Sequence, residues 1–163
     1  MTNQKEIVIE ALNEMGIDYR QVSHEAVYTI EEMTDIPLEK GEVIAKNLFV
    51  RDARGKNHFL LCLPGDKQVN LKEIRTKIGS TALSFASEDR LQTHLGLEKG
   101  AVTPFGVINN SDNKVKVYLD KELEGATAIG FHPNDNTATL FLSLADVADF
   151  IKAQGNSVSV LSL

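Results

Sequence analysis

The segment VIAKNLFVRDARGKNHFLLCL, residues 43–63, decides the fold. Two runs rich in β-branched and aromatic residues, Val43 to Arg51 and His58 to Leu63, flank the turn-forming cluster Asp52 to Lys56. Two such runs joined by a short Gly-containing loop are typical of a β-hairpin. The sequence therefore predicts a pair of antiparallel strands at the centre of the chain.

Two polar residues, Lys46 and Asn47, interrupt the apolar pattern of the first strand. One interpretation is an outward lysine that keeps its head group in water while its stem covers apolar surface. The other is a cation at the mouth of a pocket, where an ammonium can hold a phosphate as a point charge. The pattern alone leaves both open.

Outward from this hairpin, the apolar periodicity alternates between helical and strand-like segments. Capping residues and glycines predict helices over residues 3–15, 70–77, 87–95 and 143–154, and the pair Thr29 and Glu32 predicts the start of a further short helix. Strands are predicted over residues 17–22, 83–86, 105–108, 114–119, 126–131, 137–142 and 157–161. We expect one α+β domain over residues 1–163, with a mostly antiparallel, barrel-like mixed sheet flanked by helices.

The totals limit the class of protein. With 163 residues, 42% hydrophobic and 25% charged, the chain is typical of a globular protein with a core of its own. The formal net charge of −6 argues against a protein that grips DNA or long nucleic acids by charge, but it leaves room for a pocket that reads one end of an RNA. No apolar run suits a membrane span, and we expect a cytoplasmic protein. The single cysteine, Cys62, is expected to be a buried thiol.

A loop rather than a reactive side chain is the main candidate for chemistry. The stretch Gly100-Ala101-Val102-Thr103-Pro104-Phe105-Gly106 has no strong acid, base or nucleophile. Gly100 permits a positive φ, and Pro104 biases Thr103 away from helix. Successive amide hydrogens in such a turn can bind an oxyanion. The alternative is an ordinary loop before a strand.

The usual catalytic templates are absent, since the chain has no nucleophile elbow, P-loop or His-Glu-x-x-His helix. Its four histidines, His24, His58, His94 and His132, are not at metal-ligand spacing. His24 suits either a loop contact with nearby backbone or a pocket wall, and His132 suits either a structural turn or a base. An anionic or ester substrate that needs positioning more than a protein nucleophile fits this set.

In order and spacing, these motifs resemble the YbaK and prolyl-tRNA editing domain family over nearly the whole chain. The shared motifs are His24-Glu25-Ala26-Val27-Tyr28-Thr29, Ala45-Lys46-Asn47-Leu48-Phe49-Val50 with Arg51-Asp52, Val69-Asn70-Leu71-Lys72, Leu83-Ser84-Phe85-Ala86, Leu95-Gly96, Gly100 to Gly106 running into Ile108-Asn109, Phe131-His132-Pro133 and Asn136-Thr137-Ala138-Thr139. The pattern is most similar to the freestanding branch that edits alanyl-tRNA(Pro).

The resemblance implies that Gly100, Ala101, Val102, Thr103 and Pro104 place backbone amides near the scissile ester and the attacking water. It implies that Lys46 holds the phosphate near the terminal adenosine, with help from Asn47, and that His132 lines the amino-acid pocket and helps to exclude proline. We count these loop residues and Lys46 as catalytic. The expected substrate-binding residues are His24, Thr29, Asn47, Gly130 and His132.

The resemblance further implies hydrolysis of a mischarged amino acid from the acceptor end of tRNA(Pro), with assistance from the vicinal ribose hydroxyl. No metal or cofactor is expected, and prolyl-tRNA synthetase is a candidate partner. Alanine is the first candidate amino acid, because a pocket built for proline rejects a smaller residue by only about 1–3 kcal/mol. The alternatives are a deacylase for Cys-tRNA(Pro) or a broader range of aminoacyl-tRNAs, and a non-catalytic tRNA-binding module. Asn134 departs from the family pattern, since many relatives carry an apolar residue there.

Overall fold

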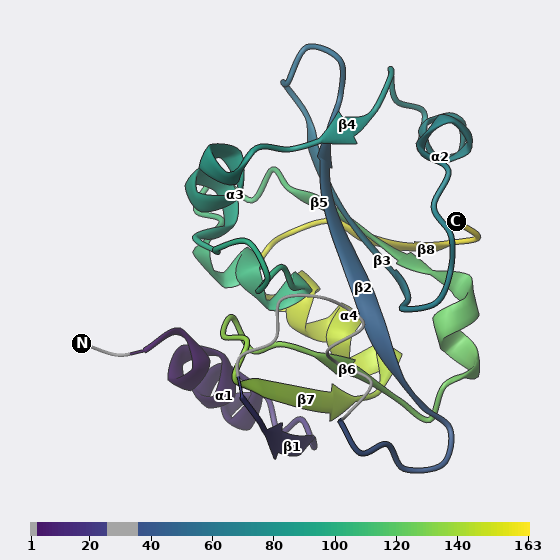
Figure 1. The fold of residues 1–163 in the computed structure, drawn as a ribbon. Coiled ribbons are helices and arrows are strands. Elements are labelled where there is room, and N and C mark those ends of the chain that lie inside the picture. The colour runs from purple at the N-terminus through teal and green to yellow at the C-terminus, as the bar shows by residue number, and fades with distance from the viewer. Residues whose placement is uncertain (1–2, 26–35) are drawn as a thin grey trace.

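The computed structural model describes residues 3–25 and 36–163, and in it the predicted hairpin forms the centre of a sheet (Figure 1). The strands are β1 (Arg20–Ser23), β2 (Glu42–Arg51), β3 (His58–Pro64), β4 (Ser84–Phe85), β5 (Lys116–Asp120), β6 (Ala128–Phe131), β7 (Ala138–Leu142) and β8 (Val158–Leu161). The helices are α1 (Gln4–Glu14), α2 (Leu71–Ile78), α3 (Glu88–Leu95) and α4 (Leu144–Ala153), with the 3₁₀ helices η2 (Pro104–Asn109) and η3 (Lys121–Gly125).

The strands form one mixed sheet in the order β1-β7-β6-β2-β3-β5-β8, and β4 pairs separately with β2. The pairs β1–β7, β6–β7, β2–β3 and β2–β4 are antiparallel, whereas β2–β6, β3–β5 and β5–β8 are parallel. The strand direction turns from nearly horizontal in β7 to nearly vertical in β2 (Figure 1), and helices lie outside this twisted sheet. The predicted α+β class, with a mostly antiparallel mixed sheet, is confirmed.

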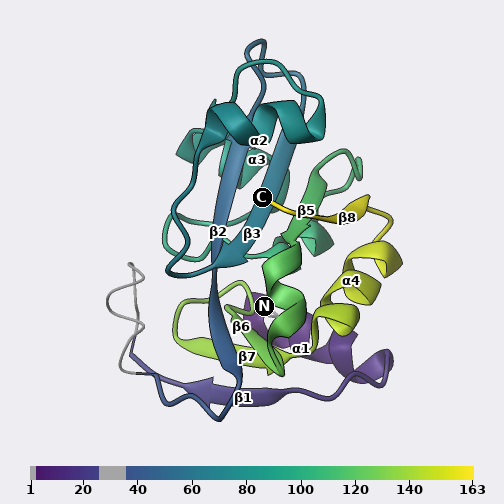
Figure 2. The same ribbon diagram turned by 90° about the vertical axis from the view of Figure 1, so that its right-hand side faces the viewer.

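Strand β2 connects the two ends of the molecule. Figure 2 shows β2 running from the layer of β1 and β7 at the bottom to the hairpin turn at the top, where α2 and α3 lie. On one edge β2 pairs with β3 over residues 45–51. On its other edge it pairs with β6 over residues 42–44 and with β4 over residues 50–51. In the part of the chain that is described, residues 45–49 therefore have no strand partner on this second edge.

The helix ends follow the capping signals in the sequence. Side-chain oxygens at the predicted N-caps accept hydrogen bonds from backbone amides of the first turn, which satisfies donors that a helix leaves unpaired. These caps are Asn3, Asn70, Ser87 and Ser143. Gly79 and Gly96 end α2 and α3 with φ values of 70° and 63°, which favour glycine. The positions of these four helices were thus predictable from local chemistry.

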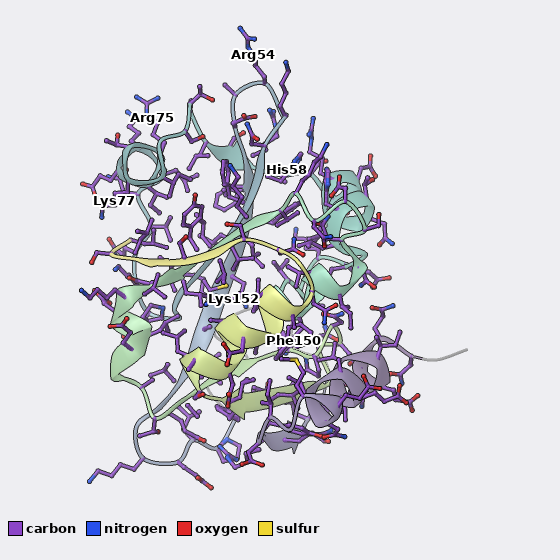
Figure 3. All side chains as sticks on the ribbon, turned by 180° about the vertical axis from the view of Figure 1, so that it is seen from behind. Arg54, His58, Arg75, Lys77, Phe150 and Lys152 are labelled. Atoms are coloured by element: carbon purple, nitrogen blue, oxygen red, sulfur yellow. The ribbon has the colours of Figure 1, made fainter. Side chains whose placement is uncertain are left out.

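The main core lies behind the sheet, where α4 crosses it (Figure 3). Phe150 of α4 is fully buried and meets Phe105 edge-on at a ring-centroid distance of 5.2 Å. From β2, Ala45 and Phe49 face this core. Cys62 is also fully buried there, as expected, and burial raises the pKa of its thiol.

The opposite face of β2 carries two smaller apolar clusters with a lysine between them. Leu48 and Val50 pack in a cluster under α2, and Ile44 packs in another beside Phe141 of β7. Because side chains alternate along a strand, Lys46 belongs to this same row. An ammonium therefore sits at the only polar position in a row that is otherwise apolar from residue 44 to residue 50.

One predicted strand is wrong. Residues 105–108 lie in η2, which begins at Pro104. Thr103 is extended, with φ −160° and ψ 150°, and its hydroxyl accepts a hydrogen bond from the Phe105 amide. A proline at the first helical position is already set to a helical φ. A run of four apolar residues does not by itself distinguish a strand from a buried helical turn.

Within the described ranges, no helix is both long enough and apolar enough to cross a membrane.

Candidate active site

The structure joins the central strand to the glycine–proline loop. The Asn47 side-chain Nδ2 donates a hydrogen bond of 3.1 Å to the Val102 carbonyl oxygen. This contact lies on the edge of β2 that has no strand partner, where the chain after α3 passes beside β2 (Figure 1). The loop thus contacts β2 at a residue between the parts that pair with β6 and β4. Two motifs that are 53 residues apart in the sequence are brought together here.

The loop has the backbone conformation that its sequence predicts. Gly100 has a φ of 92°, a left-handed conformation that glycine adopts with little cost. Ala101, Thr103 and Pro104 are buried, whereas Gly100 and Val102 are half-exposed. The loop is therefore open to solvent at Gly100 and Val102.

The amide hydrogens of the loop are only partly used. The Ala101 amide donates to the Glu98 carbonyl at 3.1 Å, and the Gly106 amide donates to the Thr103 carbonyl at 3.1 Å. Among the described residues, no acceptor lies within hydrogen-bond distance of the Val102 and Thr103 amides. Backbone donors without a partner are rare in folded proteins, so these two amides are candidate ligand contacts.

Asn47 brings an unused acceptor to the same place. Its Oδ1 atom is buried and has no hydrogen-bond partner, while its Nδ2 atom is held by Val102. A buried acceptor without a donor is costly unless a ligand or a water supplies one. The loop and the Asn47 side chain bonded to it therefore carry both donors and an acceptor without partners among the described residues.

Lys46 leaves β2 on the other face. Its Nζ atom donates a hydrogen bond to the Lys67 carbonyl oxygen. The Lys67 side chain forms ion pairs with Asp120 at 2.7 Å and Glu122 at 3.1 Å, which hold this turn in place. Lys46 itself pairs with no carboxylate in the described residues, so its charge is available to an anion.

Two histidines lie together at the end of β6 and the end of β1. The His24 Nε2 atom lies 2.9 Å from the Thr139 hydroxyl, and its Nδ1 atom donates to the Glu25 carbonyl at 2.7 Å. The ring of His132 lies edge-on to that of His24, with centroids 6.0 Å apart. The two residues, 108 positions apart in the sequence, form one histidine wall, and its place in an amino-acid pocket stays a prediction.

His132 is held as a neutral ring. It is buried, and its Nδ1 atom donates to the Ala138 carbonyl oxygen at 3.0 Å. Burial lowers the pKa of His132, with a smaller effect of His24 in the same direction. The Nε2 atom therefore keeps its lone pair and can accept a hydrogen bond.

Gly130 supports this wall. A methyl group at its Cα would lie 2.8 Å from Ile44 Cδ1, 2.8 Å from Phe141 Cε1 and 2.9 Å from Thr139 Cγ2. Thr139 in turn holds His24. The absence of a side chain at Gly130 leaves room for Ile44, Phe141 and Thr139 at this point of the sheet.

Two other predicted features differ in their outcome. Thr29, with its predicted helix start, lies outside the described residues. Asn134 has a φ of 60°, in the left-handed region that asparagine tolerates better than apolar residues do. Backbone conformation thus gives a physical reason for the asparagine at this position.

Two participants were not predicted. Thr139 is fully buried in an otherwise apolar strand, and this lone hydroxyl was a signal that the sequence did offer. The Lys67 carbonyl that holds Lys46 had no signal, because every residue has a carbonyl and only the fold brings this one near.

Comparison with known protein families shows which family this chain belongs to. A family model described as "Aminoacyl-tRNA editing domain" matches residues 24–150. The chain belongs to the aminoacyl-tRNA editing domain family. The resemblance drawn from the motifs is therefore confirmed, and so is the expectation of an editing enzyme of the deacylase class.

Similar proteins cover the whole editing domain. The prolyl-tRNA editing protein ProX of Acetoanaerobium sticklandii is 49% identical over 159 residues, which are 98% of this chain and 97% of that protein. The prolyl-tRNA synthetase associated domain-containing protein 1 of Mus musculus is 34% identical over 157 residues, 94% of this chain and 92% of that protein. A crystal structure of a candidate trans-editing enzyme for prolyl tRNA synthetase superposes with a TM-score of 0.75 at 20% identity, covering 100% of this chain and 99% of that one, and supports the fold.

Proposed function

We propose that this editing domain, taken over residues 1–163, hydrolyses the ester of alanine mischarged on tRNA(Pro) after the synthetase has released it. The 49% identity to a prolyl-tRNA editing protein supports the choice of tRNA. The observation that carries the proposal is the Asn47–Val102 hydrogen bond. It fixes a loop with two unpaired amides one residue away from the strand lysine, without any nucleophilic side chain.

In this mechanism the loop binds the oxyanion. Water adds to the ester carbonyl carbon, and the developing negative charge on the carbonyl oxygen is held by the Val102 or Thr103 amide. Such a preorganised donor typically contributes about 2.7–4 kcal/mol to the transition state. The Asn47 Oδ1 atom accepts a hydrogen bond from the water or from a ribose hydroxyl and so orients it, while the proton of the water passes through the vicinal hydroxyl to the leaving ribose oxygen. The bond to the ribose oxygen then breaks, releasing alanine and a tRNA with both terminal hydroxyls free.

Lys46 anchors the nucleotide. Its ammonium binds the phosphate next to the terminal adenosine, replacing or sharing the Lys67 carbonyl. Because the aminoacyl ester is already reactive, positioning it against the loop supplies much of the rate enhancement. The vicinal hydroxyl of the ribose is the remaining proton carrier, since His132 faces the pocket as a neutral wall.

His24, His132 and Gly130 shape the amino-acid pocket in this proposal. The wall is rigid, because each histidine is fixed by a backbone carbonyl and Thr139 braces His24. Thr29 is proposed as a further substrate contact. A rigid pocket can accept alanine and reject the larger proline ring, which completes the discrimination that a synthetase pocket alone does not reach.

The test is a panel of aminoacyl-tRNAs offered to the purified protein. We expect hydrolysis of Ala-tRNA(Pro) at a rate well above that of Cys-tRNA(Pro), Pro-tRNA(Pro) and Ala-tRNA(Ala). Preferred hydrolysis of Cys-tRNA(Pro), or equal rates on several tRNAs, would show that the proposed substrate is wrong. The proposed site residues would still stand. Binding of tRNA(Pro) without hydrolysis of any member would make the domain a non-catalytic module. Adding prolyl-tRNA synthetase to the same assay tests whether it is a partner.

A further inference from the structure

An aromatic side chain lies exposed on the strand next to the candidate site. Phe85 of β4 is 62% exposed, the highest value among the large apolar side chains that the structure describes as exposed. Strand β4 has only two residues and pairs only with β2, so its outer edge is free among the described residues. Burying such a ring normally stabilises a protein, and its exposure on a sheet edge indicates a contact surface.

Phe85 lies on the same face of the sheet as Lys46. Phe85 is directly opposite Val50, and paired residues of an antiparallel ladder project to the same side. Val50 is four residues from Lys46 along β2, a distance of about 13 Å at the rise of a strand, and both belong to the same alternating row. The proposed phosphate anchor and the exposed ring therefore face the same side of one strand pair.

This end of the molecule is basic although the chain is acidic. Residues 51–79 contain seven lysines and arginines but only three aspartates and glutamates, a net charge of +4 in a chain whose total is −6. These residues include the turn after β2, strand β3 and helix α2, and in Figure 1 the turn lies above β4 and α2 to its right. Seen from behind, Arg54 marks the turn, and Arg75 and Lys77 mark α2 (Figure 3).

The cations at this end are not neutralised within the protein. The Asp52 carboxylate of the turn is buried and accepts from the Lys56 and Asn57 amides and from the Asn57 side chain. These hydrogen bonds, that of the Asn57 side chain first, lower the pKa of Asp52. Five lysines and arginines of the turn and α2 form no ion pair with a described carboxylate: Arg51, Arg54, Lys56, Lys72 and Arg75. Lys77 instead donates to an oxygen of Leu163 at 3.0 Å.

We infer that β4 and its basic flanks bind the single-stranded 3′ tail of the tRNA, and that one unpaired base upstream of the terminal adenosine stacks on Phe85. The inference rests on the proposed function, which places the terminal phosphate at Lys46. A cationic track with an exposed aromatic ring is the arrangement by which proteins hold single strands, since every base has a face that can stack. The cations of the turn and α2 contact the backbone on either side.

The experiment measures binding rather than hydrolysis. The probe is an uncharged RNA hairpin that carries the tRNA(Pro) acceptor stem and its single-stranded tail, titrated with the full-length protein. Phe85→Ala is expected to raise the dissociation constant about 10-fold or more, because a base-stacking ring is removed. Phe85→Trp should retain binding. Leu38→Ala is the matched control, because Leu38 is 50% exposed and lies away from β4 in sequence and pairing.

A second set of probes locates the base. Each tail nucleotide in turn is replaced by an abasic one. At one position this replacement should weaken wild-type binding as much as Phe85→Ala does, and it should have no further effect on the Phe85→Ala protein. Far-UV and near-UV circular dichroism of the variant check that it is folded.

The outcomes separate this inference from the proposed function. If wild-type protein binds the probe and hydrolyses Ala-tRNA(Pro) but Phe85→Ala binds equally well, the stacking site is wrong and the function stands. The stacking site would also be wrong if Phe85→Ala lost the same affinity for a blunt-ended hairpin that has no single-stranded tail. If the wild-type protein neither binds the probe nor hydrolyses any aminoacyl-tRNA, the inference and the proposed function fail together.

Discussion

Lys46 shows how one residue can be costly for a strand and useful for a site. Its neighbours in the same row, Ile44 and Leu48, pack in apolar clusters, and an aliphatic residue at position 46 would join those clusters. The lysine instead places an ammonium between them, held by the Lys67 carbonyl. One hydrogen bond to a carbonyl leaves two ammonium protons for a phosphate.

Replacing this ammonium should reduce activity far more than stability. For Lys46→Ala we expect the kcat/KM for Ala-tRNA(Pro) to fall about 10- to 150-fold, the range for one hydrogen bond to a charged group. The free energy of unfolding should change by less than about 1 kcal/mol, because only one contact with a carbonyl is lost. Single-turnover deacylation and chemical denaturation measure the two quantities.

The matched control is Lys116→Ala, which removes an exposed strand lysine from β5. It should leave kcat/KM within about twofold of wild type, since surface substitutions have small effects. Unchanged activity in Lys46→Ala would contradict the phosphate contact.

Residue chemistry made part of this site predictable. The lysine and asparagine stood out because they broke an apolar strand, and Gly100 and Pro104 stood out because they restrict the backbone. The pairing of Asn47 with Val102 was not readable, since it depends on β2 having an open edge between β4 and β6.

At the scale of elements, strand β6 needs a glycine where it passes β2 and β7. For Gly130→Ala we expect a loss of about 1–3 kcal/mol of stability, because the new methyl group would contact side chains from both neighbouring strands at 2.8–2.9 Å. Hydrolysis should fall as well, since Ile44 or Thr139 must move below the histidine wall. Chemical denaturation and deacylation assays measure both effects.

Gly125→Ala is the matched control for this prediction. Its position has no atom within 4 Å of a new Cβ and no positive φ, so the same substitution should cost little or stabilise slightly. Equal stability of the Gly130 and Gly125 variants would show that β6 has room for a side chain.

The start of β3 packs against α3 through a buried histidine. His58 accepts a hydrogen bond of 3.0 Å from Arg90 Nη1 at its Nε2 atom, and its ring centroid lies 3.9 Å from that of His94 and 5.5 Å from that of Phe49. Burial, with the nearby His94 and Arg90, lowers the pKa of His58 to about 4, against a smaller opposing effect of Asp52. Protonation of His58 would turn its Nε2 atom into a donor that faces the Arg90 guanidinium, which is also a donor.

This contact predicts a loss of stability in mild acid. Below pH about 6.5 the unfolded chain protonates His58 while the folded chain does not, so the unfolded state gains protons and stability falls as pH falls towards 4. Between pH 7.5 and 5 the free energy of unfolding should drop by up to about 2 kcal/mol from this group. His132 acts in the same direction, since burial lowers its pKa too.

Denaturant titrations at pH 7.5 and 5 compare wild type with His58→Gln. The variant should lose the part of the decrease in stability that comes from His58 and keep the part that comes from His132, so its decrease between pH 7.5 and 5 should be smaller. Carboxylates contribute little in this window, since their pKa values in the unfolded chain lie near 4. The same slope in both proteins would assign the acid sensitivity elsewhere.

Some helices and strands were predictable from the sequence, and others were not. Helices α1 to α4 could be located because their caps are local, within three residues of the first turn. The hairpin was equally local. By contrast, η2 was predicted as a strand, because its apolar run satisfies either structure and only contact with the core decides. The strand order likewise depends on contacts between distant segments.

At the scale of the whole molecule, the charges are segregated. The basic turn and α2 lie at one end, while the remainder of the chain carries the excess of acids. A local field of this kind can attract and orient an RNA even when the net charge is negative. The net charge of −6 argues against a general nucleic-acid binder, yet it conceals this arrangement, because a net charge does not say where the charges lie.

Segregation predicts that the place of a charge matters more than the total. Arg75→Glu on α2 and Lys152→Glu on α4 change the net charge equally, and the two positions lie on separate helices at separate heights (Figure 3). At low ionic strength we expect Arg75→Glu to reduce kcat/KM for Ala-tRNA(Pro) about 3- to 10-fold through slower association, and Lys152→Glu to change it less than twofold. The gap should shrink as salt rises, because exposed charges are screened within about 10 Å at 0.1 M and about 3 Å at 1 M. Deacylation rates across a salt series measure this. Equal effects of the two substitutions at every salt concentration would mean that only the net charge acts, and that the basic end of the molecule is not where the RNA approaches.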